Sequence, residues 1–363
     1  MKKRYFLLGV MAALVMLGTE RVATGFAQPV TTKIAGLNPE FRIITTNGIE
    51  VRAAIQGQGP LVVLVHGFPE SWYSWRHQIA PLAAAGFTVC AIDLRGYGGS
   101  DKPYPVDAYT MKEMTADVAG VIDALSPDQP AVLIGHDWGA PIVWHTALLY
   151  PNKVRAVAGL SVPYRGVPPE PLNRIFKKNF TDQGKFFYMA YFQDEGVAEA
   201  ELEVDVRDSL RRMYFAASAD SAGHWGAPGK PLGEPLLKGL ENPDPFPAWL
   251  SAGDIDYYVG EFQRSGFRGP INRYRNYEPD WQLVQALPDP VIYQPSLFVA
   301  GAQDMVLKMF GFHEGATAAM QASVGKFLAD LRGVHLIPDC GHWTQQEAPE
   351  QTTRILIDWL SNL

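Results

Sequence analysis

The chain has few of the features that characterise disulfide-rich, nucleic-acid-binding or cofactor-binding proteins. Among 363 residues it has two cysteines, Cys90 and Cys340, too few for a disulfide framework. Both adjoin apolar, strand-like runs, so we expect two buried thiols. The formal net charge is −7 and no basic patch is present, which argues against nucleic acid as a partner. The sequence also lacks a metal-ligand cluster, a phosphate loop and a nucleotide fingerprint, so no metal and no cofactor are implied.

Long hydrophobic runs are also absent, apart from one near the start of the chain. Residues 1–5 are basic and residues 6–18 are apolar, but this run is too short to cross a bilayer comfortably. Residues 25–27, Gly-Phe-Ala, form a small–x–small cleavage site. We therefore predict a signal peptide over residues 1–27, with an uncleaved anchor as the alternative. The mature protein is expected to be exported to the bacterial periplasm or the outside of the cell, without stable membrane insertion.

What the sequence does contain is an alternation of apolar runs with helical patterns. Continuous apolar strands separated by helices predict a mostly parallel sheet, here of eight strands, covered by helices on both faces. The first two strands, joined around Asn47-Gly48, are expected to form an antiparallel hairpin at one edge. The expected strands are 41–45, 51–55, 61–65, 88–92, 131–134, 154–160, 297–300 and 334–337, and the expected helices are 72–85, 111–125, 140–149, 313–331 and 347–360.

This alternation is interrupted between residues 163 and 290. The segment is rich in aromatic residues and proline, its helical patterns are irregular, and no buried strand is evident. It follows the sixth strand and precedes the seventh, so it would lie at the carboxyl ends of the strands, where open α/β sheets bind ligands. We predict an α/β core formed by residues 28–163 and 291–363, with a helical lid over 164–290 that is not an independent domain.

A candidate nucleophile stands at the end of the fifth strand. Asp137 lies between Gly135 and Gly139, in a small–x–nucleophile–x–small pattern that joins the strand to the helix over 140–149. Such a sharp turn requires glycine on both sides, because side chains there would clash. A carboxylate in this position suggests attack on carbon and an alkyl-ester intermediate. The alternative is an ordinary helix N-cap.

The partners that such a nucleophile needs follow other strands, in the order nucleophile, acid, histidine. Asp304 comes just after the seventh strand, and His342 lies on a short glycine-containing loop after the last one. In a triad the acid would orient the imidazole and the histidine would activate water. The backbone N–H groups of Phe68 and Trp138 are the expected oxyanion donors.

Four further residues lie next to these groups in the sequence. His66 and His136 each flank a turn, and we expect their rings to bond backbone groups. Glu70 and Trp72 directly follow the oxyanion loop, so they are candidates for lining the substrate pocket or positioning the hydrolytic water. Glu70 is equally well explained as a surface carboxylate that caps the helix beginning at Trp72.

With these motifs, the chain resembles the epoxide hydrolases of the α/β-hydrolase fold. It is especially similar to the hydrolase domain of the mammalian soluble enzyme and to its plant relatives. The resemblance covers roughly residues 40 to 363 and includes motifs of the core and of the lid. These motifs are residues 66–76, 135–139 and 340–345 in the core, and 188–193, 196–201 and 265–275 in the lid.

The resemblance implies hydrolysis of an apolar epoxide by water, with Asp137 as nucleophile and His342 as base. In this family two lid tyrosines hold the epoxide oxygen, and the matching positions are Tyr188 and Tyr274. Ring opening generates an alkoxide, a poor leaving group, which a neutral phenol can stabilise by donating a hydrogen bond. Tyr191 is a competing candidate, since it would share nearly the same helix face as Tyr188.

Other functions remain open at this level. A haloalkane or haloacid dehalogenase would share the aspartate and the histidine, but it would leave the paired tyrosines unexplained. A catalytically inactive binding protein would have no need of a complete triad. A serine esterase is excluded because no serine stands in a comparable turn.

Overall fold

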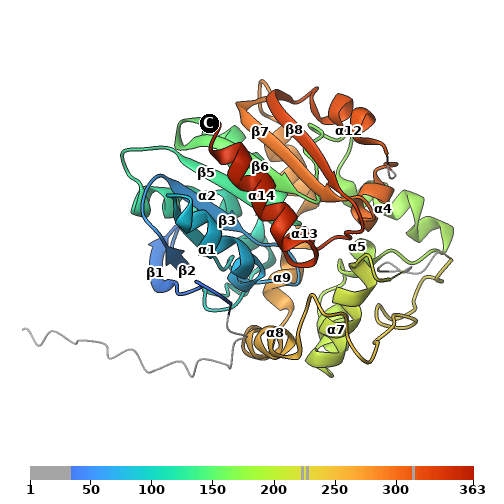
Figure 1. Ribbon diagram of the computed structural model, residues 1–363. Helices are drawn as coiled ribbons and strands as arrows, with labels where there is room; N and C mark the ends of the chain where they lie inside the picture. Colours follow the sequence, from blue (N-terminus) through green and yellow to red (C-terminus); the bar gives the residue numbers. More distant parts are fainter. Residues whose placement is uncertain (1–33, 222–224, 226–228, 313–314) are drawn as a thin grey trace, which may run out of the picture.

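Eight strands form a single sheet between two layers of helices (Figure 1). The computed structural model describes residues 34–221, 225, 229–312 and 315–363, and the predicted signal peptide lies outside them. Neighbouring strands follow the order β1-β2-β4-β3-β5-β6-β7-β8. Their bounds are β1 Glu40–Thr46, β2 Ile49–Gln56, β3 Leu61–Val65, β4 Thr88–Ile92, β5 Ala131–His136, β6 Val154–Leu160, β7 Ile292–Gly301 and β8 Leu328–Ile337.

The predicted mixture of strand directions is confirmed. Strands β3 to β8 pair in parallel, whereas β1 and β2 form an antiparallel hairpin at one edge. Asn47 and Gly48 both have positive φ angles, 45° and 76°, as a tight hairpin turn requires. β3 and β5 are buried along their whole length, which explains their uninterrupted apolar sequences.

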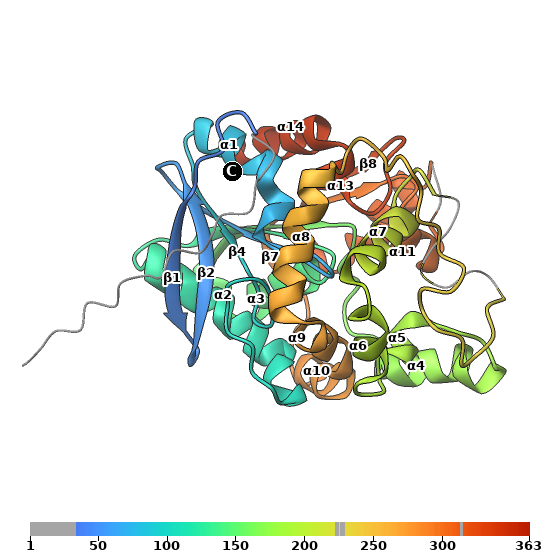
Figure 2. The ribbon, with the colours of Figure 1, turned by 90° about the horizontal axis from the view of Figure 1, so that it is seen from below.

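Helices cover both faces of the sheet (Figure 2). On one side lie α1 (Arg76–Ala84) and α14 (Pro349–Leu360), and on the other lie α2 (Met111–Leu125) and α3 (Gly139–Leu149). None of the helices in the described ranges combines the length and apolar character needed to cross a bilayer. The two cysteines are free and buried, as predicted.

Between β6 and β7 the chain leaves the sheet and forms a helical insertion. In Figure 2 the first part of this insertion lies on the side of the molecule away from the β1–β2 hairpin, whereas its helix over Ala252–Ser265 crosses the middle of the view. Its described residues contribute one isolated β-bridge, between Lys185 and Pro231, and no strand. The helices are α4 Leu172–Asn179, α5 Tyr188–Tyr191, α6 Val197–Leu202, α7 Val206–Ala217, α8 Ala252–Ser265, α9 Arg268–Asn272 and α10 Tyr277–Gln285, with the 3₁₀ turns η4 Thr181–Gln183 and η5 Arg273–Arg275.

One expected helix is wrong over its last residues. In the region predicted as helix 313–331, α12 covers Thr317–Val324, and β8 then begins at Leu328; residues 313 and 314 lie outside the described residues. Leu328 and Leu331 are spaced as on a helix face, but they pair in register with Ile292 and Ser296 of β7. Pairing with a strand distant in the sequence therefore overrides the local pattern. The expected helix 72–85 is a 3₁₀ turn, η1 (Trp72–Trp75), followed by α1.

Candidate active site

Asp137 lies at the turn between β5 and α3, with a strained backbone. Its φ angle is 49°, in the left-handed region that non-glycine residues rarely adopt. A Cβ at Gly135 would overlap with the backbone of Gly139, and one at Gly139 would overlap with the backbone of Val65, so the predicted need for both glycines is confirmed. The N-cap interpretation is wrong, because α3 has no side-chain cap at its start. The Asp137 side chain does not cap α3 and is therefore free to act as a nucleophile.

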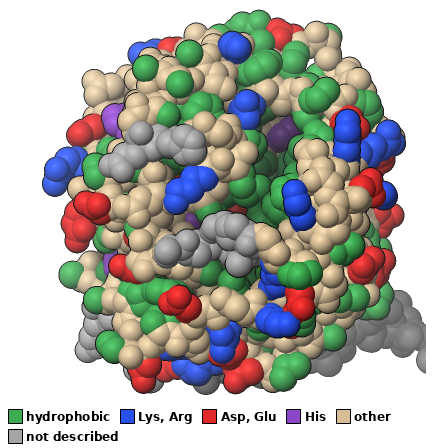
Figure 3. Space-filling view, turned by 90° about the vertical axis from the view of Figure 1, so that its right-hand side faces the viewer, with side chains coloured by type: hydrophobic (Ala, Val, Ile, Leu, Met, Phe, Trp, Pro, Cys, Tyr) green, Lys and Arg blue, Asp and Glu red, His purple; other side chains and the backbone are tan. Residues whose placement is uncertain are grey.

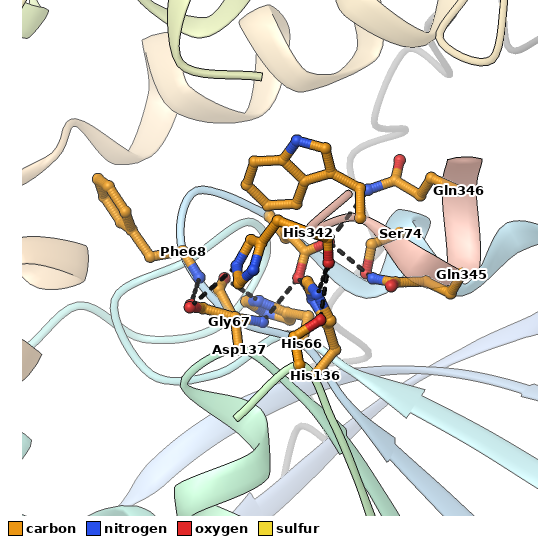
Figure 4. A network of polar contacts seen from close by, with 12 residues as sticks. His66, Gly67, Phe68, Ser74, His136, Asp137, His342, Gln345 and Gln346 are labelled. Carbon is orange, nitrogen blue, oxygen red and sulfur yellow. Dashed lines mark hydrogen bonds and ion pairs between the residues drawn. The ribbon is translucent and has the colours of Figure 1, made fainter. Parts of the chain in front are cut away.

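The three predicted triad residues lie together, and Figure 4 shows two of them, Asp137 and His342. The imidazole of His342 has its Nε2 atom 3.3 Å from Oδ2 of Asp137. Its Nδ1 atom lies 3.0 and 3.1 Å from the two carboxylate oxygens of Asp304, which follows β7. The Asp304 side chain is fully buried, whereas that of Asp137 is 14% exposed. Asp137 is thus the carboxylate that a small molecule can reach.

The charges of the triad residues shift the pKa values of His342 and Asp137. Burial alone would lower the pKa of His342, but the charges and hydrogen bonds of Asp304 and Asp137 raise this pKa well above its usual value. Burial would raise the pKa of Asp137, yet the hydrogen bond and charge of His342, with help from His136 and the Phe68 N–H, hold it below its usual value. These shifts favour the charged forms of the pair, a carboxylate on Asp137 and an imidazolium on His342.

The main chain of His342 is bound on two sides. Its N–H donates to the carbonyl of Ala217, at the end of α7 in the insertion (3.0 Å). Its carbonyl accepts hydrogen bonds from Nε2 of His136 and from the hydroxyl of Ser161, each at 2.8 Å. These two residues belong to the core, so the histidine loop is held between the core and the insertion.

The backbone donors near Asp137 match an oxyanion site. The Phe68 N–H donates to Oδ1 of Asp137 at 2.8 Å. The Trp138 N–H, at the start of α3, has no acceptor among the residues that the structure describes. Gly67, before Phe68, leaves no room for a side chain, because an added Cβ would overlap with the Asp137 carboxylate. Both predicted donors thus flank the nucleophile.

Two tyrosines of the insertion, Tyr188 at the start of α5 and Tyr274 in η5, lie over this group. The ring centroids of Tyr274 and Trp138 are 5.1 Å apart, and the ring centroids of the two tyrosines are 6.2 Å apart. Both side chains are buried, yet neither hydroxyl has a hydrogen-bond partner within the described part of the chain. Burial, together with the negative charge of Asp137, raises the pKa of each phenol well above 10, so both keep their proton. Tyr191 differs, because its hydroxyl donates to Glu201 at 2.7 Å.

Glu70 is fully buried, so its interpretation as a surface carboxylate is wrong. One of its oxygens receives the Gly67 N–H (2.9 Å) and lies 2.8 Å from Nδ1 of His136. The other receives the side-chain amides of Gln345 and Gln346, at 2.8 and 3.0 Å. These contacts occupy the usual acceptor capacity of a carboxylate. Glu70 therefore joins the oxyanion loop to the nucleophile turn and to the segment after His342.

Trp72 is not brought together with the other predicted residues. Its indole N–H donates to the hydroxyl of Tyr257 at 2.6 Å. Its ring packs edge-on against that of Phe41, with the ring centroids 5.0 Å apart. These partners belong to α8 and β1, and neither is a triad residue. Sequence reasoning also missed Ser161, Gln345 and Gln346, although the last two closely follow His342 and this proximity was a usable signal.

The space above Asp137 is lined with aromatic rings. The ring of Phe68 packs edge-on against the rings of Phe192 and Trp225. The distances between the ring centroids are 5.7 and 5.8 Å. Figure 3 shows a hollow on one face of the molecule in which hydrophobic side chains gather. No cluster of His, Cys, Asp and Glu suited to a metal ion is found in the described residues. The arrangement provides an ionised carboxylate, a histidine and two phenols within an apolar enclosure.

Comparison with known proteins gives a consistent result. Residues 60–349 match the family model described as alpha/beta hydrolase fold. The chain is 40% identical to Epoxide hydrolase A of Mycobacterium tuberculosis, over 90% of this chain and 98% of that protein. It is 39% identical to Bifunctional epoxide hydrolase 2 of Mus musculus, over 86% of this chain and 54% of that protein. Among solved structures, an epoxide hydrolase from an endophytic Streptomyces superposes with a TM-score of 0.82 at 41% identity, covering 90% of this chain and 96% of that one.

Proposed function

The chain belongs to the epoxide hydrolases of the α/β-hydrolase fold, and from this membership we propose that it converts an apolar epoxide and water into a vicinal diol. The observation that carries the proposal is the pairing of an ionised Asp137 with two buried phenol groups that have no described partner. The aromatic enclosure supports an apolar substrate. Since both phenols come from the insertion, residues 164–290 act as a catalytic lid.

In the first step a carboxylate oxygen of Asp137 attacks one epoxide carbon from the side opposite the ring oxygen. A C–O bond forms to the aspartate while the ring C–O bond breaks, which leaves an alkyl ester. The released electron pair remains on the substrate oxygen. Tyr188 and Tyr274 donate hydrogen bonds to this oxygen as its charge develops. The oxygen becomes the first hydroxyl by taking up one proton, which balances the proton that the His342 imidazolium gives up.

In the second step water attacks the carbonyl carbon of the ester. Once Asp137 is esterified its negative charge is gone, so the pKa of His342 falls and the imidazole can act as a base. His342 takes a proton from the water, and Asp304 stabilises the imidazolium that results. The N–H groups of Phe68 and Trp138 bind the oxyanion. Collapse of this intermediate releases the diol and restores the Asp137 carboxylate.

Isotope transfer tests this mechanism directly. Excess enzyme is mixed with styrene oxide in H₂¹⁸O for a single turnover, and the peptide containing Asp137 is analysed by mass spectrometry. We expect ¹⁸O in this peptide, because water attacks the carbonyl carbon and leaves its oxygen on the aspartate. Diol formation with an unlabelled peptide would contradict the ester mechanism. Halide release from a haloalkane, with no turnover of the epoxide, would instead identify a dehalogenase.

We also propose that residues 1–27 direct export and are then removed, on the strength of their basic, apolar and small-residue segments. The protein would then act in the bacterial periplasm or outside the cell. Mass spectrometry of the N-terminal peptide from fractionated cells tests this proposal. A mature chain beginning at residue 28 outside the cytoplasm is expected, whereas an intact N-terminus on the cytoplasmic protein would contradict it.

A further inference from the structure

The loop that carries His342 is attached to the end of α7 in the insertion. Besides the His342 N–H bond to Ala217, the indole N–H of Trp343 donates to the carbonyl of Tyr214 at 2.8 Å. The two backbones also pack closely, because a Cβ at Gly341 would overlap with the backbone of residues 218–219. The position of the histidine loop therefore depends on a segment outside the core.

Glu347, at the end of α13 (Thr344–Glu347), bridges the two segments with one carboxylate. One oxygen receives the N–H groups of Ala219 and Gly341, each at 2.9 Å. The other receives the N–H of Trp343, also at 2.9 Å. Within the described ranges Glu347 forms no ion pair with lysine or arginine, so these three backbone groups are the hydrogen-bond donors to its charge.

We propose that Glu347 is a positioning residue for ester hydrolysis, which fastens the loop of His342 to the end of α7. Two of its three donors, Gly341 and Trp343, are the immediate neighbours of the base. The third, Ala219, belongs to the insertion. Through Glu347 the insertion therefore sets the position of the base, in addition to supplying the tyrosines. This inference depends on the two-step reaction proposed above.

The geometry predicts that the effect is confined to one step. Besides its contact with Nε2 of His342, Asp137 is held by the Phe68 N–H and by its own N–H bond to the carbonyl of Leu160, neither of which involves α7. Tyr188 and Tyr274 lie on α5 and η5, away from Glu347 in the chain. Displacing the histidine loop should therefore slow hydrolysis of the ester and leave its formation nearly unchanged.

The test is a rapid-quench experiment on Glu347→Gln with styrene oxide. The replacement amide keeps the shape but turns one acceptor into a donor that faces a backbone N–H. We expect ester formation within about twofold of the wild-type rate and ester decay slower by about tenfold or more, since small displacements of a catalytic group have effects of this size. The control is Glu350→Gln, three residues further along and exposed, which should leave both rates unchanged.

A second variant separates positioning from loss of folding. Gly341→Ala forces the two backbones apart while Glu347 remains, so it should also slow ester decay selectively. Thermal unfolding is recorded for every variant. Unchanged ester decay, or an equal loss in both steps, in the folded variants would overturn the inference. Absence of any ester in the wild-type enzyme would instead refute the two-step reaction itself.

Discussion

The triad forms the floor of the site, and Tyr188 and Tyr274 form its roof. These two sides hold their functional groups in different ways. On the floor, hydrogen bonds and charges fix the side chains: Asp304, for example, contacts His342 with both oxygens and also accepts the N–H of Val306. In the roof, the rings of Tyr188 and Tyr274 are packed among other rings, and their hydroxyls have no partner in the described structure.

This difference matches what each side has to do. The floor must keep a carboxylate and an imidazole in a defined geometry through two steps, and a network of charged hydrogen bonds provides this. The roof must offer donors to an oxygen that arrives with the substrate. Ring packing orients Tyr188 and Tyr274 without using the hydroxyls, so their donor capacity remains for the reacting molecule.

Removing the nucleophile from the floor, while the roof stays intact, should have the largest effect on activity. Asp137→Ala retains the roof and the histidine, but no ester can form. We expect diol production to fall by about 10⁵-fold, which is the size of effect seen when a nucleophile is removed. Chromatographic assay of the diol measures this loss, with circular dichroism as a check on folding. Activity within tenfold of wild type would mean that water attacks the epoxide directly.

Loss of the base should separate the two steps of the reaction. In His342→Gln the nucleophile and the roof remain, so the ester should form and then persist. We expect its decay to slow by about 10³-fold, within the range for loss of a general base. Intact-mass spectrometry would reveal the accumulated ester as a mass increase equal to that of the substrate. If no adduct accumulates and turnover is normal, His342 is not the base.

The roof is tested by removing one hydroxyl at a time. Tyr188→Phe and Tyr274→Phe keep the ring packing but remove a donor, so ester formation should slow by about 10²-fold in each, as for the loss of one oxyanion donor. The matched control is Tyr191→Phe, whose hydroxyl is bound to Glu201. Stopped-flow measurement of the first step compares the three. Equal rates in all three variants would remove the tyrosines from the mechanism.

The smallest expected effect concerns stability and pH. The folded pKa of His342 is raised, so its contribution to the free energy of unfolding is complete below the unfolded value of about 6.5 and is lost as the pH rises through the folded pKa. Wild type should therefore lose more stability on the alkaline side than His342→Gln does. Urea unfolding of both proteins across this pH range gives the comparison. Parallel curves would show that the protonated histidine does not stabilise the fold.

Much of the fold could be predicted because its core strands are apolar runs separated by helical patterns. The bounds of β3, β4 and β6 agree with the expected ones. The start of β8 could not be predicted in this way, because the spacing of Leu328 and Leu331 suits a helix as well as a strand. Hydrogen bonding to β7 decides between them, and it depends on residues far away in the sequence.

The triad could be predicted for a similar reason, since the carboxyl ends of neighbouring parallel strands bring the residues that follow them together. The supporting contacts could not. In the sequence, Glu70 is equally consistent with a surface carboxylate that caps a helix. Its burial results from how several loops fold against one another. Trp72 was expected near the site because it is close to Phe68 in sequence, but the turn at η1 directs it to Tyr257 instead.

The lack of space at Gly67 has a consequence for changing the range of compounds that the enzyme accepts. Any side chain at this position would displace the Asp137 carboxylate, so variation there should inactivate the enzyme before it alters selectivity. A ring of the aromatic enclosure such as that of Phe192 offers a better starting point for mutant libraries, because it packs against another ring, that of Phe68, and not against the Asp137 carboxylate. Libraries aimed at new epoxides should therefore diversify the aromatic wall and leave the glycine loop intact.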